Sequence, residues 1–199
     1  MPPPWATAWT GASRVVPADP GPEGPPLTEG VRAALLARRV VMVSGQLDQP
    51  QASEVAATLM TLDAIGDDHV ELHITSATGP IEPGMVLIDV MEVLGVPVHT
   101  VGMGVVGGGV VGVLAAGTHR QLSRHARLNL REPDVEVSGR ATEIERALAE
   151  HAARRETYYR LLARCTGRPV SEIEAEWVVG HFTAAEDAIA LGYADKLLP

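Results

Sequence analysis

A glycine-rich run at residues 101–117, VGMGVVGGGVVGVLAAG, contains a spacing that is typical of nucleotide binding. Gly102, Gly104 and Gly107 satisfy the G-x-G-x-x-G pattern, in which a tight turn lets the backbone approach a pyrophosphate. A dinucleotide site also needs its motif in the first strand–helix unit and an acidic residue about 20 positions later. Here two such units precede the run, and residues 121–127 contain no Asp or Glu. No Lys-Ser/Thr pair follows either, so the pattern disfavours both a dinucleotide site and a P-loop.

Hydroxyl and imidazole side chains elsewhere in the chain are candidates for nucleophilic catalysis. A serine or threonine becomes a nucleophile when a nearby base takes its proton. None of the candidates has a known motif spacing, so we interpret them as turn formers and surface imidazoles. Cys165, the single cysteine, is interpreted as a packed helix residue rather than a reactive thiol. We expect neither a metal nor a cofactor. The hydroxyl candidates are Ser76, Thr78, Thr100, Thr118 and Ser123, and the imidazoles are His99, His119, His125 and His181.

The elements that must position these residues alternate between strands and helices. Short apolar or alternating runs predict strands, and apolar residues at helical spacing predict helices. The glycine-rich run begins directly after the third predicted strand. Repeated strand–helix units predict an α/β fold with largely parallel strands. The predicted strands are 40–43, 70–74, 96–101 and 126–130, and the predicted helices include 48–63 and one from about residue 83 to 94.

The last third of the chain is predicted to be helical. A long amphipathic helix covers about 139–165 and ends at Gly167 and Pro169. Two further helix starts are predicted from capping-box spacings. These boxes are Ser171-x-x-Glu174 and Thr183-x-x-Glu186.

Composition limits the domains, partners and compartment. Residues 1–27 hold eight of the fifteen prolines together with Trp5 and Trp9, which predicts a flexible Pro-rich segment before one domain at 28–199. A docking segment that uses the two tryptophans is the alternative. The net charge of −9 argues against nucleic acid or an anionic membrane as the partner. The lone cysteine and the lack of a secretory signal pattern favour the cytoplasm.

Several segments follow a known family in the same order. From residue 35 onward the sequence resembles the ClpP family, the proteolytic subunits of caseinolytic proteases. The resemblance implies a ClpP/crotonase-like α/β fold, with repeated strand–helix units and a protruding handle helix at about 139–165. The matching segments are ITSATGP at 74–80 (family INSPGGS), LAAG at 114–117 (LAAG), RLNLREP at 127–133 (RVMIHQP), GRATEI at 139–144 (GQATDI) and TGRP at 166–169 (TGQP).

The family's catalytic residues are all replaced in this sequence. Members hydrolyse peptides with a Ser-His-Asp triad, and the three positions correspond here to Gly108, Arg131 and Gly180. Glycine has no side chain to attack a carbonyl, a guanidinium has no lone pair to accept a proton, and Gly180 has no carboxylate to orient an imidazole. The resemblance therefore implies a catalytically inactive subunit similar to the ClpR proteins.

Some features of the family do not depend on the triad side chains, namely its backbone hydrogen-bond donors and its assembly surfaces. The family's oxyanion-hole donors correspond to the backbone N–H groups of Thr78, Gly79 and Gly109, which leaves open an enzyme with crotonase-like acyl chemistry or residual peptidase activity. The resemblance implies heptamer-like rings of this chain alone or with an active ClpP paralogue, and an AAA+ unfoldase as a further partner. The handle would carry an apolar stripe at Ile144, Leu148, Ala152, Tyr159 and Leu162. The resemblance implies that this stripe contacts another subunit, and the alternative is that it packs only within its own chain.

Overall fold

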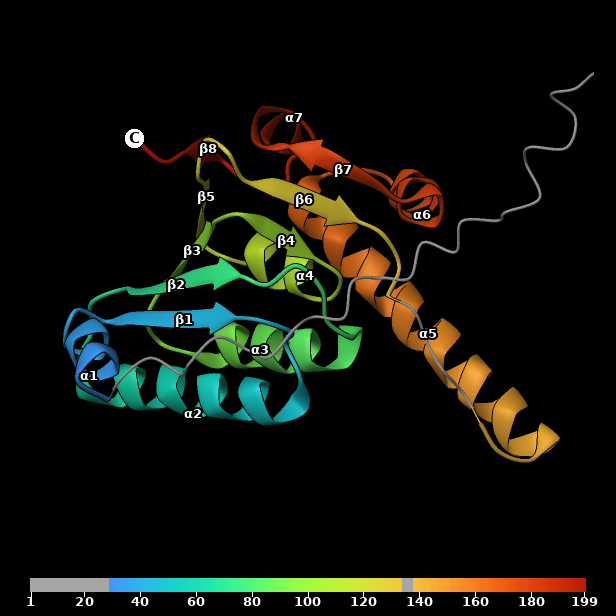
Figure 1. Ribbon diagram of the computed structural model, residues 1–199, viewed down its shortest axis with the longest axis horizontal. Coiled ribbons are helices and arrows are strands. Elements are labelled where there is room, and N and C mark those ends of the chain that lie inside the picture. The colour runs from blue at the N-terminus through green and yellow to red at the C-terminus, as the bar shows by residue number, and fades with distance from the viewer. Residues whose placement is uncertain (1–28, 134–137) are drawn as a thin grey trace, which may run out of the picture.

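Two β-sheets form the framework of the chain in a computed structural model that describes residues 29–133 and 138–199 (Figure 1). The larger sheet has the order β1-β2-β3-β5-β8, and all of its neighbouring strands are parallel. The smaller sheet has the order β4-β6-β7, with β4 parallel and β7 antiparallel to β6. The strands are β1 Val40–Ser44, β2 Val70–Thr75, β3 Val98–Gly102, β4 Val105–Gly107, β5 His119–Leu122, β6 Arg127–Leu130, β7 His181–Ala184 and β8 Lys196–Leu197.

Seven helices in the described ranges surround these sheets. Helices α2 and α3 pack against each other and lie along one face of the larger sheet (Figure 1). Helix α4 is short and wholly buried. The helices are α1 Glu29–Ala37, α2 Gln49–Ile65, α3 Ile81–Val93, α4 Val110–Ala115, α5 Ala141–Thr166, α6 Val170–Val179 and α7 Ala185–Ala190.

The core lies between the larger sheet and its helices. Along β2 every second residue is buried, so Val70, Leu72 and Ile74 point into the core and Glu71 and His73 point outward. This period of two is what a strand with one covered face requires. The burial pattern confirms the predicted strand, and the architecture confirms the α/β fold with largely parallel strands.

Both predicted capping boxes are wrong. Helix α6 begins at Val170 after Pro169, so Ser171 lies inside its first turn. A proline has a fixed φ near −65° and starts this helix without a side-chain cap. Thr183 lies in β7, where its backbone pairs with Leu128, and helix α7 begins two residues later. The Thr183 Oγ1 atom is buried without a hydrogen-bond partner.

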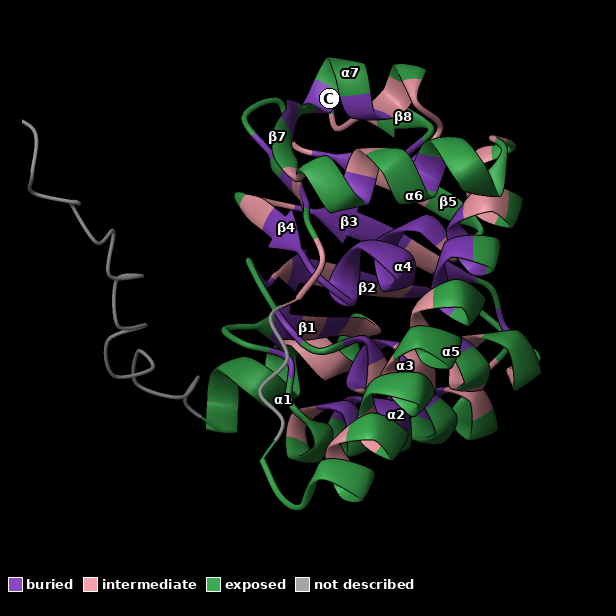
Figure 2. Cartoon of the chain, turned by 90° about the vertical axis from the view of Figure 1, so that its right-hand side faces the viewer, coloured by how far each residue is buried: buried purple, intermediate pink, exposed green. Residues whose placement is uncertain are grey.

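Helix α5 projects from the body of the protein (Figure 1), and much of it is exposed (Figure 2). It starts two residues after the predicted start and ends at Gly167, which has a φ of 72° and donates its N–H to the carbonyl of Ala163. Its buried residues all lie in the C-terminal half. Of the predicted stripe, Tyr159 and Leu162 are buried, whereas Leu148 is 52% exposed. Neither α5 nor any other helix in the described ranges is long and apolar enough to cross a membrane. The predicted Pro-rich segment 1–27 lies outside the described residues.

Candidate functional site

The glycine-rich run forms a sharp elbow between β4 and α4. Strand β4 ends at Gly107, and helix α4 begins at Val110. Gly108 has a φ of 60°, in the left-handed region that side chains disfavour. Two consecutive glycines at 108 and 109 thus let the chain reverse from strand to helix. The turn is sufficient to explain these glycines, so they need no role in binding a phosphate.

A second segment, residues 76–80, closes onto this elbow. It follows β2 and leads into α3. The Gly107 N–H donates to the Ser76 carbonyl, and the Gly109 N–H donates to the Gly79 carbonyl, both at 3.0 Å. The Gly109 N–H, one of the three expected oxyanion-hole donors, is therefore already hydrogen-bonded. Thr78 is exposed and Gly79 is buried in the same segment.

The two segments meet backbone to backbone. A Cβ atom at Gly108 would lie 2.5 Å from the Gly79 carbonyl oxygen and 2.9 Å from its nitrogen. A Cβ at Gly109 would lie 2.1 Å from the Pro80 oxygen. Real Cβ contacts do not occur below 3.0 Å. The space that a nucleophile at position 108 would need is thus filled by the peptide groups of 79–80.

Tyr158 of α5 closes the elbow from the opposite side. Its hydroxyl donates to the Gly108 carbonyl and accepts from the Gly112 N–H, at 2.9 Å in each case. The side chain is fully buried, and this burial raises the pKa of Tyr158 well above its ordinary value. Gly112 is the third residue of α4, so its N–H has no partner within the helix. Tyr158 supplies that partner and joins the long helix to the elbow.

The other two predicted positions, Arg131 and Gly180, adjoin each other at the same end of the smaller sheet. Arg131 follows β6 and Gly180 precedes β7, and these strands pair through Leu130 and His181. A Cβ at Gly180 would lie 3.1 Å from the Arg131 Cγ. Because β4 and β6 are parallel and in register, Gly108 and Arg131 follow neighbouring strand ends. The structure thus gathers all three positions at one end of this sheet.

A polar cluster beside these positions was not predicted from the sequence. The Tyr159 hydroxyl donates to a Glu132 oxygen, and Arg155 lies 3.3 Å from the same carboxylate. Burial raises the pKa of Tyr159, and the hydrogen bond to Glu132 raises it further. The ring of Trp177 packs against both Tyr158 and Tyr159. The sequence signal for this cluster was the position of Tyr159 on the predicted apolar stripe of the long helix.

The other candidate nucleophiles are not paired with bases. The Ser76 hydroxyl donates to the Thr78 carbonyl at 3.0 Å, and the Thr100 hydroxyl donates to the Leu114 carbonyl at 2.7 Å. Within residues 29–133 and 138–199, none of the candidate hydroxyls is hydrogen-bonded to a histidine, and no three His, Cys, Asp or Glu side chains are arranged to hold a metal ion. Cys165 is half-buried, and burial raises its pKa.

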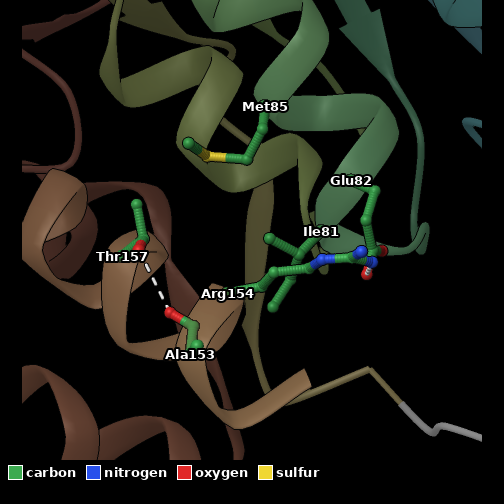
Figure 3. Close-up of a pocket in the computed structure, with 6 residues that line it drawn as sticks. All are labelled: Ile81, Glu82, Met85, Ala153, Arg154 and Thr157. Atoms are coloured by element: carbon green, nitrogen blue, oxygen red, sulfur yellow. Dashed lines mark hydrogen bonds and ion pairs between the residues drawn. The ribbon is translucent and has the colours of Figure 1, made fainter. Parts of the chain in front are cut away.

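A cavity of about 340 Å³ lies next to the elbow, between the first turn of α3 and the middle of α5 (Figure 3). Arg154 extends across it to Glu82, with 3.0 Å between nitrogen and oxygen. Burial raises the pKa of Glu82, but hydrogen bonds from its own backbone and from Arg154 outweigh this and lower it overall. The apolar part of the lining comes from Ile81, Met85 and Ala153.

Comparisons with known proteins agree with this architecture. Residues 27–199 match the Clp protease family model. The chain is 31% identical to ATP-dependent Clp protease proteolytic subunit 2 of Chlamydia muridarum, over 84% of each chain. It is 29% identical to proteolytic subunit 1 of Mycobacterium leprae, over 86% of this chain and 88% of the relative. Subunit 1 of Mycobacterium tuberculosis is also 29% identical, over 88% of this chain and 90% of the relative. The chain therefore belongs to the Clp protease family.

Proposed function

We propose that this chain is a non-proteolytic subunit of a Clp-type assembly, with a structural or regulatory role. The observation that carries the proposal is the closed elbow at Gly108. This position corresponds to the family's nucleophile, has no side chain, and has the Gly79 peptide where a side chain would begin. The neighbouring Arg131 and Gly180 offer neither a general base nor a carboxylate to orient one.

The geometry weighs against acyl chemistry without a triad. Such chemistry needs backbone N–H groups that point at a developing oxyanion. The Gly109 N–H is instead bonded to the Gly79 carbonyl at 3.0 Å. An oxyanion there would have to displace this bond and move the 76–80 segment, which is packed against three consecutive glycines.

The projecting half of α5 supports an assembly role. Residues 141–157 contain no buried position, although the helix continues without a break into the core. An isolated helical extension has little to stabilise it, because most helical stability in proteins comes from packing. Relatives named as Clp protease proteolytic subunits motivate rings of this chain, alone or with an active paralogue, and an AAA+ unfoldase as a further partner.

The first test is activity of the purified chain. It is incubated with fluorogenic peptides and with a fluorophosphonate probe, which labels an activated serine. We expect neither turnover nor labelling. An active Clp proteolytic subunit treated in parallel is the positive control. Labelling of this chain, or turnover that increases with its concentration and survives further purification, would overturn the proposal.

The second test is assembly. Native mass spectrometry of the chain, alone and after mixing with an active paralogue from the same source, reports ring formation directly. We expect a multi-subunit ring in at least one of the two samples. A strict monomer in both would remove the assembly role and leave only the inactive site.

A further inference from the structure

Four of the seven histidines gather on the outward face of the larger sheet, away from the elbow. His73 lies in β2, His99 in β3 and His119 in β5, and His69 directly precedes β2. The strand register places Glu71, His99 and His119 side by side across three strands. A row of this kind is not required by the core, because these positions point away from it.

Three of these rings contact one another. The His69 and His99 rings stack with their centroids 4.1 Å apart and an interplanar angle of 22°. The His119 ring meets the edge of His99 at 4.5 Å and 76°. The ring of His99 therefore contacts two other imidazoles, one stacked on it and one at its edge. Contact at this distance is favourable for neutral rings, whereas two protonated rings at about 4 Å repel each other.

Several charged groups surround the cluster, and one of them, Asp195, gives the outer ring of His119 an alternative partner. On β2, Glu71 carries the negative charge that faces His99, and it already bonds to His73 at 2.9 Å. On the β8 side, Lys196 adds positive charge near His99. Asp195 attracts a protonated His119, although its carboxylate also binds Arg120 of β5. Strand β1 contributes only the apolar Val40 opposite Glu71. The side chain of Arg39 adds a hydrogen bond to the His69 carbonyl.

We propose that His69, His99 and His119 form an acid-sensitive clasp across the β2–β3–β5 part of the sheet. The clasp is closed while the rings are neutral. When a second ring of the stack takes a proton, His119 moves off His99 toward Asp195 and the β3–β5 seam loosens. The clasp lies at the starts of β2 and β3. Strand β2 leads into the 76–80 segment, and β3 is followed by β4, which leads into the elbow. It is a property of this chain that does not depend on its catalytic state.

The direction of the pH effect follows from His99. Burial lowers the pKa of His99 below its ordinary value of 6.5, the rings of His69 and His119 lower it further, and Glu71 opposes them. The closed state therefore holds His99 neutral more firmly than an opened state does. Its contribution is complete above pH 6.5 and is lost as the pH falls from there through the lower folded pKa.

Hydrogen exchange measured by mass spectrometry tests the clasp on the full chain between pH 7.5 and 5.0, with rates corrected for their intrinsic pH dependence. We expect peptides from β3 and β5 to open more readily in acid, while peptides from α2 stay unchanged. After this correction, we expect exchange from β3 and β5 to be roughly fivefold faster at pH 5.0 than at pH 7.5. No acid response in these strands of the wild-type protein would overturn the clasp.

Two variants assign the response to the cluster. His99→Gln removes the central ring, and we expect the acid response of β3 and β5 to disappear. His125→Gln removes an exposed histidine in the turn after β5 and serves as the matched control, with an unchanged response. His119→Gln replaces His99→Gln if the latter does not fold. An acid response of wild-type size in the cluster variant would overturn the proposal.

Discussion

The carbonyl oxygen of Gly79 accepts a hydrogen bond from the N–H of Gly109 at 3.0 Å. This bond joins the segment after β2 to the elbow after β4 and fills the position where a side chain at residue 108 would begin. Position 108 therefore requires glycine for two reasons: its φ is positive, and the backbone of Gly79 approaches it closely. The two reasons are separable by experiment.

Gly108→Ser is expected to destabilise the protein and to leave it without peptidase activity. The left-handed φ of 60° costs a side chain about 1–2 kcal/mol, and the 2.5 Å approach to the Gly79 oxygen adds to this. Gly104→Ser is the matched control, because Gly104 has a φ of 62° and no heavy atom within 4 Å of a new Cβ. Urea unfolding should show the larger loss of unfolding free energy for Gly108→Ser. Equal losses in the two variants would show that the close approach contributes nothing.

Tyr158→Phe is expected to lower the free energy of unfolding by about 1–3 kcal/mol, because it leaves the buried Gly112 N–H without its hydrogen-bond acceptor. Tyr159→Phe is the control on the adjacent residue. Its partner Glu132 keeps the contact with Arg155 and is partly exposed, so the loss should be smaller. Urea unfolding monitored by circular dichroism measures both values. A larger loss for Tyr159→Phe would contradict the role assigned to Tyr158 in the elbow.

Stability in acid should depend on the pair of Arg120 and Asp195. Burial raises the pKa of Asp195, but hydrogen bonds from the Arg120 side chain and backbone outweigh this and leave it below 3.8. Because the folded pKa is lowered, the stabilisation is present above the unfolded pKa and is lost as the pH falls below about 4. Asp195→Asn should flatten this part of a plot of melting temperature against pH. Asp187→Asn, at an exposed site on α7, should leave the plot unchanged.

The sequence predicted most of the longer elements, but it missed helix α1 and several short strands. Helix α2 and strand β2 were recognisable because their buried residues repeat at helical spacing in α2 and at every second position in β2. Strands β4 and β8, with three and two residues, are too short to show such a repeat. Their positions depend on neighbouring strands rather than on local pattern. Thr183 illustrates the same limit, since a helix-capping spacing was overridden by antiparallel pairing with Leu128.

The packing around the predicted triad positions could not be predicted from the sequence. The resemblance located the elbow at Gly108, and the structure brings Arg131 and Gly180 to the same end of the smaller sheet. The contact between Gly79 and Gly109 joins residues that are 30 positions apart, and no local spacing encodes it. The same holds for Tyr158, whose hydroxyl reaches an elbow 50 residues earlier in the chain.

Leu148→Arg is expected to weaken assembly without changing the fold of the subunit. Leu148 is 52% exposed on the projecting half of α5, where no described residue buries it. Leu148 belongs to the apolar stripe predicted for α5, and residues 141–157 of this helix contain no buried position. The proposed assembly role therefore places a contact on this half of the helix. An arginine there would place a charge in the contact, which is costly unless it is paired.

Ala149→Arg is the matched control for this variant, because it adds the same charge at the next exposed residue, about 100° around the helix. Sedimentation velocity, with and without an active paralogue, measures the assembly, and circular dichroism checks the helix content. We expect Leu148→Arg to shift the distribution toward smaller species while Ala149→Arg retains more of the complex. Equal behaviour of the two variants would place the interface elsewhere on the protein, since a contact through this stripe must distinguish positions that differ by 100° on the helix.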